Sequence, residues 1–248
     1  MKRQGQVTIF VIAGIIILTL IGAILAFRTT IIKEEIKQEE VAPLLSTSIQ
    51  EYVESCIQKS GEEALLFVAQ HGGYYQLPEL AEQELLLPYY FYGNKSHVVS
   101  REELEKQISR YMDDNLFFCI RNFAPFRKAG YEIKQEEVST SITVLPERVV
   151  FDVTFPITVT QDALSKQLLF FSRNVQSRIG TMREVVTDFM AEQEKDATAL
   201  CVSCLVNPAI EADMRTEITP VRNDTIKIIL IDEKIPYEFI FLNQYYVG

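Results

Sequence analysis

One uninterrupted apolar run near the start constrains this chain more than any other feature. Residues 7–27 read VTIFVIAGIIILTLIGAILAF and contain no charged side chain. A helix rises about 1.5 Å per residue and the apolar core of a bilayer is about 30 Å thick, so the run is long enough to cross a membrane once. A helix in a soluble core would carry a polar stripe, which this run lacks. We therefore expect a single membrane anchor.

A cleaved secretory signal is the main alternative to an anchor. The apolar region of such a signal has only about 7–15 residues and ends at small residues near the cleavage site. The run in this chain is longer, and the segment from Arg28 to Lys33 that follows it has no A-x-A pattern. The apolar helix is therefore expected to remain in the mature protein, with the lipid bilayer as its partner.

Several features favour a position outside the cell for the rest of the chain. Lys and Arg flank the apolar run on both sides, so the positive-inside rule does not decide the orientation. Four cysteines suit an oxidising compartment, and Asn94 and Asn223 begin glycosylation sequons. The 34 acidic and 24 basic residues give a formal net charge of −10. Such a surface repels phosphate backbones, so no nucleic-acid partner is expected.

The first residues carry a resemblance to a known class of proteins. The sequence KRQGQ at residues 2–6, followed by the apolar run, resembles the class III signal (pilin-like) N-terminus of archaeal proteins. In those proteins a peptidase cuts after the Gly and the apolar helix stays, which implies cleavage between Gly5 and Gln6. Many pilins carry Glu five residues after the cut, where this chain has Phe10. The remainder resembles uncharacterised single-span archaeal surface proteins, a likeness that implies no particular activity.

The chain divides into four segments on this reading: a leader-like segment at 1–6, the anchor at 7–27, a helical stalk at 28–48 and an extracytoplasmic domain at 49–248. Apolar residues continue at helical spacing beyond the anchor, and Pro43 is expected to kink the helix. Gly72 and Gly73 should end it, because glycine adopts a left-handed cap without steric cost.

The extracytoplasmic domain is predicted to have an α+β fold. Ser100 and Glu103 form a capping-box pattern at the start of a helix that extends to about residue 120. Alternating apolar residues predict strands at 149–155 and 169–175, and a helical period returns at 179–190. A hairpin is expected from residues 225–231 and 237–245. Strands that follow one another without alternating helices favour a mainly antiparallel sheet with packed helices.

The four cysteines fall into two pairs. Cys56 and Cys119 each lie late in a predicted helix, so two helices side by side would bring them close enough to form a disulfide; two buried thiols are the alternative. Cys201 and Cys204 form a CxxC, which fits a redox-active dithiol, a local disulfide or two core thiols on a helix at 197–206. No strand leads directly into this CxxC, and a second pair of zinc ligands is lacking.

No other motif predicts catalysis, a cofactor or a metal site. His71 and His97 are the only histidines; His71 suits a helix C-terminus, and His97 lies in a polar turn. Asp113 and Asp114 are expected on a solvated helix face. Tyrosines at 74–75 and 89–92 suit either a sheet core or a recognition patch. We therefore expect a protein that is not an enzyme.

Small residues give the anchor an expected association face. Gly22 and Ala26 form the tightest small pair on it, and small residues allow helices to approach closely in lipid. The leading hypothesis is a single-pass, membrane-anchored structural or interaction protein whose partners are other membrane or surface proteins, including itself. One alternative is an anchored binding module that uses the tyrosines, and another is an anchored thiol oxidoreductase that uses Cys201 and Cys204.

Overall fold

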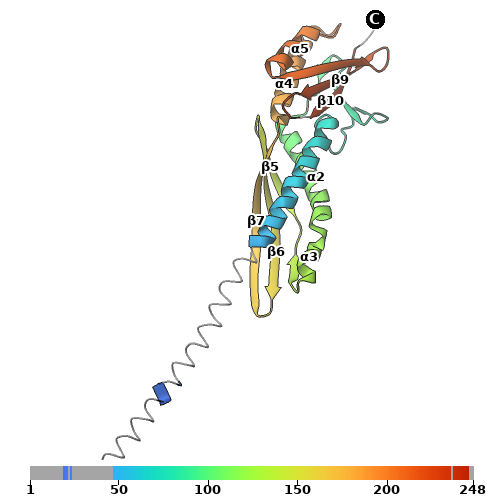
Figure 1. The fold of residues 1–248 in the computed structure, drawn as a ribbon. Helices are drawn as coiled ribbons and strands as arrows, with labels where there is room; N and C mark the ends of the chain where they lie inside the picture. Colours follow the sequence, from blue (N-terminus) through green and yellow to red (C-terminus); the bar gives the residue numbers. More distant parts are fainter. Residues whose placement is uncertain (1–18, 22, 24–46, 236, 246–248) are drawn as a thin grey trace, which may run out of the picture. The chain divides into compact units, whose positions relative to one another are not determined.

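The computed structural model describes residues 19–21, 23, 47–235 and 237–245. The contacts between residues divide the chain into two units, residues 1–49 and residues 50–248. The second unit contains almost all the described secondary structure, and the paragraphs below concern that unit (Figure 1). It has an α+β fold with two separate sheets where the sequence suggested one.

A helix at residues 47–70 leads into the domain and buries one apolar face, which includes Val53, Ile57 and Leu65. It ends as the sequence predicted. Gly72 and Gly73 both have positive φ, and the Gly73 N–H donates to the Val68 carbonyl at 2.8 Å, which satisfies one of the last open carbonyls of the helix. A side chain at Gly72 would collide with Pro88 and with the Ile240 carbonyl, so the turn also needs glycine for space.

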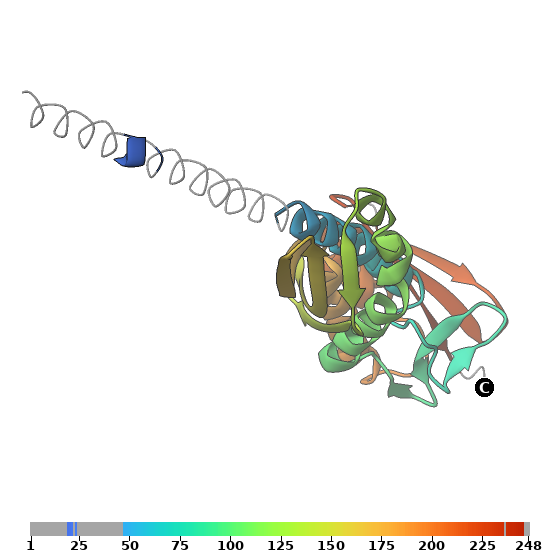
Figure 2. The ribbon, with the colours of Figure 1, turned by 90° about the horizontal axis from the view of Figure 1, so that it is seen from below.

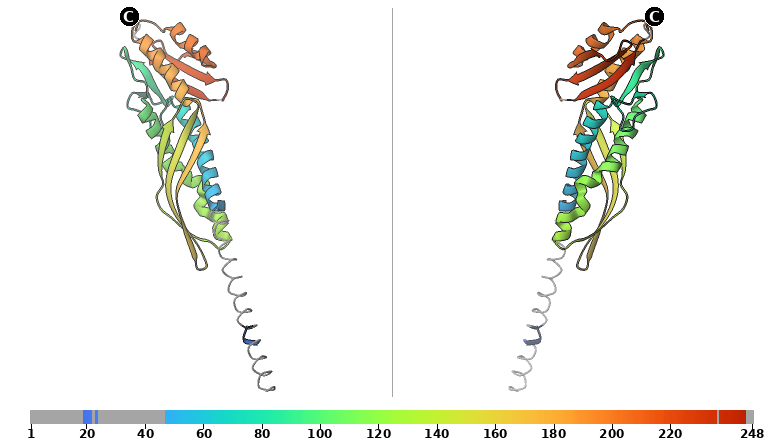
Figure 3. Two further views of the ribbon diagram at one scale, coloured as in Figure 1. Left: turned by 90° about the vertical axis from the view of Figure 1, so that its left-hand side faces the viewer. Right: turned by 90° about the vertical axis from the view of Figure 1, so that its right-hand side faces the viewer.

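A four-stranded antiparallel sheet is built around one long hairpin. Strand β6 (Arg148–Gln161) pairs along its length with β7 (Leu164–Gln176) on one side, and on its other side with β4 (Glu132–Gln135) and β5 (Ser139–Val144) in turn. Alternate β6 residues are buried, including Phe151 and Phe155. Figures 2 and 3 show the hairpin beside the helix of residues 47–70, and Arg173 of β7 forms an ion pair with Glu54 at 2.6 Å.

The second sheet contains six strands in the order β1-β2-β10-β9-β8, with β3 paired to β2. All neighbours are antiparallel except β2 and β10, which are parallel. Tyr90 of β2 stacks on Phe241 of β10 with ring centroids 4.8 Å apart, and both side chains are fully buried. The bounds of these strands are Ala81–Glu82 (β1), Leu87–Tyr92 (β2), Lys95–Ser96 (β3), Met214–Pro220 (β8), Thr225–Asp232 (β9) and Glu238–Gln244 (β10).

Helix α2 (Arg101–Ile120) begins at the predicted cap, where the Ser100 hydroxyl accepts from the Glu103 N–H at 3.1 Å. It ends in an unusual way, because Arg121, Asn122 and Phe123 all have positive φ. Each such residue costs about 1–2 kcal/mol when it is not glycine, and full burial of Phe123 offsets part of that cost. The short η1 (Arg121–Phe123) and α3 (Ala124–Lys128) complete this corner.

Two further helices, α4 (Ile179–Gln193) and α5 (Val202–Glu211), lie at the end of the domain that holds the six-stranded sheet (Figure 1). Arg178, just before α4, is bound by both carboxylate oxygens of Asp232 at the end of β9, at 3.0 Å each. Both side chains are buried, so this pair ties α4 to the sheet and would be costly to break.

Most of the expected elements are present. The hairpin β6–β7, helix α4 and the hairpin β9–β10 confirm the predictions from residue spacing. The helix expected at 197–206 is displaced, because α5 begins only at Val202 and Cys201 stands at its N-cap. The stalk at 28–48 and Pro43 lie almost wholly outside the described residues.

Candidate functional site

The outer edge of β7 is a strand edge that no other described strand pairs with. This strand pairs with β6 on one side, and no described strand pairs with its other side. An unpaired edge presents a row of backbone N–H and C=O groups that can form hydrogen bonds with another chain. Natural proteins commonly protect such edges with proline, a bulge or a covering helix, and β7 contains neither proline nor glycine.

The opposite edge of the same sheet is covered. The Ser109 hydroxyl on α2 donates to the Thr140 carbonyl of β5 at 2.7 Å, and the Glu105 carboxylate accepts from the Val144 N–H at 2.9 Å. Glu105 and Ser109 lie four residues apart, so both project from the same face of the helix. Helix α2 therefore satisfies two backbone groups of the β5 edge. Among the described residues no side chain bonds the outer backbone of β7 in this way, although the helix of residues 47–70 lies beside the hairpin and Glu54 pairs with Arg173.

The side chains of β7 make its centre apolar and uncharged. Phe170 is 72% exposed, and Leu164 and Leu169 are 38% and 37% exposed. The segment QLLFFS at 167–172 has no charge, no proline and no glycine, a composition that readily pairs with another strand. Lys166 and Arg173 border this segment. We call residues 164–176 the β7 edge.

The structure joins Cys56 to Cys119, the pairing that the sequence predicted, with Cα atoms 5.5 Å apart. The disulfide links the helix of residues 47–70 to α2. One turn before Cys56, the Tyr52 hydroxyl lies 3.1 Å from the Cys119 carbonyl and 3.0 Å from the Ile120 carbonyl. These are carbonyls of the last turn of α2, so Tyr52 caps this helix beside the disulfide.

Cys201 and Cys204 are joined in a local disulfide at the first turn of α5. Both residues are partly exposed, and Val202 and Ser203 between them are exposed. The Cys201 Sγ lies 3.9 Å from the Ser203 Oγ. A cavity of about 470 Å³ opens beside Cys204, between α4 and α5, and is lined by Asp188, Ala191, Glu192, Ser203, Cys204, Asn207 and Pro208.

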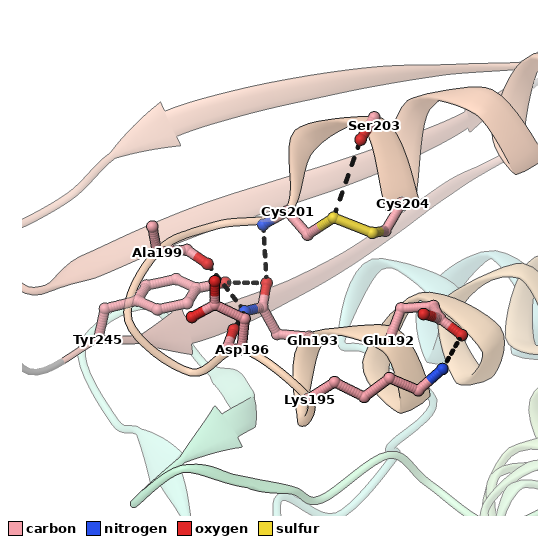
Figure 4. Close-up of a disulfide and its surroundings, with 9 residues drawn as sticks. All are labelled: Glu192, Gln193, Lys195, Asp196, Ala199, Cys201, Ser203, Cys204 and Tyr245. Carbon is pink, nitrogen blue, oxygen red and sulfur yellow. Dashed lines mark hydrogen bonds and ion pairs between the residues drawn. A yellow bond between two sulfur atoms is a disulfide. The ribbon is translucent and has the colours of Figure 1, made fainter.

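Gln193, at the end of α4, holds the loop that leads to this disulfide (Figure 4). Its side-chain amide donates to the carbonyls of Asp196 at 2.7 Å and Ala199 at 2.9 Å. Its Oε1 accepts from the Cys201 N–H at 3.0 Å and from the Tyr245 hydroxyl at 3.1 Å. The side chain is fully buried and uses both its donors and its acceptor. The loop is thus fixed by hydrogen bonds as well as by the disulfide.

The histidines make local contacts. His71 Nδ1 lies 2.7 Å from the Phe67 carbonyl, and its ring stacks on that of Phe67 at the end of the helix, where the sequence placed it. His97 Nε2 lies 3.3 Å from the Tyr92 carbonyl. Neither contact joins a nucleophile to a base, so the described structure assembles no triad around a histidine.

Asp113 lines a second cavity, of about 410 Å³, together with Glu136, Glu137 and Phe117. Burial raises the pKa of Asp113, and the nearby Asp114 raises it further against hydrogen bonds from Thr140. Asp113 and Asp114 are nevertheless both exposed on α2, which confirms the expected solvated helix face. Within the described ranges, no three His, Cys, Asp or Glu residues are grouped as a metal site would require.

The tyrosine-rich segment belongs mainly to the core. Tyr89, Tyr90 and Phe91 are at most 9% exposed, and only Tyr92 reaches 36%. The sheet-core interpretation of this run is therefore the correct one. Asn94 lies at the exposed turn between β2 and β3, and Asn223 in the exposed turn between β8 and β9, so both acceptor asparagines are exposed, although Thr225 of the second sequon is buried.

The expectations for the N-terminal segment fall largely outside the described residues. Gly5, Gln6, Gly22 and Ala26 all lie there, and only residues 19–21 and 23 of the anchor are described. In the part of the chain that the structure does describe, no helix is both long and apolar enough for a bilayer span.

Two features of the domain were not foreseen. The Arg178–Asp232 pair joins residues far apart in the sequence, and no local pattern marks it. Gln193 looks like an ordinary polar residue at a helix end, because its importance comes from the four groups that surround it. No family model, no curated protein and no solved structure matches this chain.

Proposed function

We propose that this chain is a single-pass, membrane-anchored extracytoplasmic structural protein, without enzymatic turnover, whose copies associate through the β7 edge. The observation that carries the proposal is the contrast between the two edges of one sheet, because α2 covers one edge and no described strand pairs with the other. A long strand with an uncharged centre and an exposed Phe170 is a ready partner for strand addition.

The location outside the cell is supported by the cysteines and by the surface. Both pairs form disulfides, and disulfides persist mainly in oxidising compartments. Asn94 and Asn223 are exposed and available for glycosylation. Residues 7–27 supply the anchor, and a cut between Gly5 and Gln6 would remove the leader and leave the anchor in place.

A second copy of the chain is the occupant that best fits the β7 edge. In an antiparallel pair of β7 strands centred on Phe170, Lys166 faces Asn174 of the second copy and Arg173 faces Gln167, so no cation opposes a cation. The two Phe170 rings then meet across the strands, a favourable aromatic pair. An acidic segment of another protein is the competing occupant, and the experiment below separates the two.

The experiment uses the full chain in detergent micelles or membranes. Phe170→Lys places two lysines opposite each other at the centre of the paired strands and should lower the dimer fraction at least tenfold. Phe118→Lys is the matched control, because Phe118 is 64% exposed but lies on α2. Sedimentation velocity and crosslinking report the dimer fraction. A monomeric wild-type chain, or equal effects of the two variants, would overturn the proposed contact.

Orientation and processing are tested separately. In intact cells, a membrane-impermeant amine reagent should label lysines of the domain, such as Lys195 and Lys234. The intact mass of the native protein should correspond to a chain that begins at Gln6. Recovery of a peptide that contains Lys2 from the mature surface form would reject the pilin-like leader, and unlabelled lysines in intact cells would reject the orientation.

A further inference from the structure

We propose that the Cys201–Cys204 disulfide is an exchange site that oxidises a dithiol on a peptide or protein with basic flanking residues. This chemistry is separate from self-association through β7. It is a stoichiometric, two-electron exchange, in which the disulfide present in the protein is the oxidant.

The disulfide is accessible, and the loop that carries it has a second support. Both cysteines are partly exposed, whereas in the other disulfide only Cys119 is partly exposed and Cys56 is 3% exposed. Gln193 holds the Cys201 N–H and the carbonyls of Asp196 and Ala199 without help from either sulfur atom. Opening the S–S bond therefore leaves the Cys201 backbone in place, so the disulfide can be reduced to the dithiol within the folded domain.

The surroundings favour one direction of attack. The cavity of about 470 Å³ is lined by Cys204 and not by Cys201, so we assign Cys204 as the cysteine that an incoming thiolate attacks. Cys201 then leaves as a thiolate at the N-cap of α5. Unpaired N–H groups at a helix N-terminus stabilise a thiolate, and the Ser203 hydroxyl 3.9 Å away is placed to donate to it. A better stabilised thiolate leaves faster.

The exchange balances in two steps. In the first, a substrate thiolate forms a bond to the Cys204 Sγ and the Cys201–Cys204 bond breaks. In the second, the other substrate thiolate attacks the substrate sulfur of this mixed disulfide and Cys204 leaves as a thiolate. The substrate ends as a disulfide, and its two protons end on Cys201 and Cys204.

The charges around the cavity select the substrate. Glu192 is engaged by Lys195 at 2.5 Å. Asp188 lines the same cavity and has no ion-pair partner among the described residues. The cavity is thus anionic, so it attracts a substrate with Lys or Arg beside its thiols and disfavours acidic thiols.

The test follows opening of each disulfide in the oxidised, full-length protein. Two synthetic dithiol peptides with the same cysteine spacing, one flanked by Lys and one by Glu, are added and the reaction is quenched with N-ethylmaleimide. Mass spectrometry of the digested protein then locates the labelled cysteines. The reference is the oxidised octapeptide of residues 199–206, which contains the same CxxC without the domain.

The Lys-flanked peptide should open Cys201–Cys204 at least tenfold faster than it opens the octapeptide, and faster than the Glu-flanked peptide does, while Cys56–Cys119 stays closed. Asp188→Asn should reduce the ratio of the opening rate with the Lys-flanked peptide to that with the Glu-flanked peptide. Equal rates for the protein and the octapeptide, or opening only where the domain unfolds, would overturn the proposal.

Ser203→Ala tests the leaving group. It should slow opening several-fold without changing the free energy of unfolding, whereas Val202→Ala, at an exposed neighbour without contact to the sulfur atoms, should leave the rate unchanged. A Lys-flanked peptide with a single thiol stops at the mixed disulfide, which should be found on Cys204. A mixed disulfide on Cys201, or equal rates for the two variants, would reject the assigned direction of attack.

Discussion

The two disulfides of this protein show how similar bonds serve different purposes in different surroundings. Cys56 and Cys119 are 63 residues apart in sequence, and their disulfide joins two helices. Tyr52, which caps one of these helices, lies beside it. Cys201–Cys204 spans three residues at the surface, in a loop that Gln193 already holds. The loop-closure model assigns about 4 kcal/mol to the first and about 2 kcal/mol to the second. The first is needed for stability, and the second is free to react.

Removal of the long-range disulfide should have the largest effect. The double substitution Cys56→Ala and Cys119→Ala is expected to lower the free energy of unfolding by about 4 kcal/mol, because the unfolded chain regains the freedom of a long loop. Urea unfolding under non-reducing conditions measures this loss. A loss below about 1 kcal/mol would mean that the packing around Tyr52 holds the helices by itself.

Loss of Gln193 should rank second. Gln193→Ala leaves the Cys201 N–H and two loop carbonyls without their buried partner, and each such group costs about 1–3 kcal/mol. We expect a total loss of about 3 kcal/mol by urea unfolding. Glu192→Ala, at the exposed preceding residue, is the control and should be nearly neutral. If Gln193→Ala costs less than removal of Cys201 and Cys204, the disulfide and not the glutamine holds the loop.

Removal of the short disulfide should cost less. The double substitution Cys201→Ala and Cys204→Ala is expected to lower the free energy of unfolding by no more than about 2 kcal/mol, the loop-closure value for so small a ring. Thermal unfolding of this variant and of the Cys56 and Cys119 double variant, at the same protein concentration, compares the two losses of stability. Equal losses from the two double variants would remove the distinction between them.

The smallest effect concerns alkaline pH. Burial raises the pKa of Tyr245 to about 12, against a hydrogen bond from Asn243 that lowers it. The unfolded chain releases this proton near pH 10, so stability is complete below pH 10 and falls as the pH rises toward 12. In Tyr245→Phe, the free energy of unfolding should fall less steeply between pH 10 and 12, by a slope that corresponds to at most one proton. An unchanged slope would show that Tyr245 is ionised equally in both states.

The local elements of the fold could be predicted from the sequence because their signals are local. The Ser100 cap, the alternation along β6 and the glycines after residue 70 each depend on neighbours within a few residues. The Cys56–Cys119 pairing was expected because both cysteines were placed late in predicted helices. The pairing is correct, but Cys56 lies in the first half of the helix of residues 47–70. These predictions needed no knowledge of how distant segments meet.

Features that depend on distant segments could not be predicted. Short strands such as β1 and β3 have too few residues for a period, and the parallel pairing of β2 with β10 joins opposite ends of the domain. The lack of a described strand beside the outer edge of β7 depends on how distant segments pack, as does the cover of β5 by α2. Gln193 matters because Cys201 and Tyr245 converge on it, and neither neighbour is evident from its position in the chain.

The position of β10 in the six-stranded sheet determines when that sheet can be completed during synthesis. Strand β10 lies between β2 and β9, yet it is synthesised about 150 residues after β2. During synthesis, Tyr90 and Phe91 therefore remain uncovered until β10 has been made. A chain that ends before Glu238 keeps an open sheet and an exposed aromatic core. The six-stranded sheet can thus close only after β10 has been synthesised.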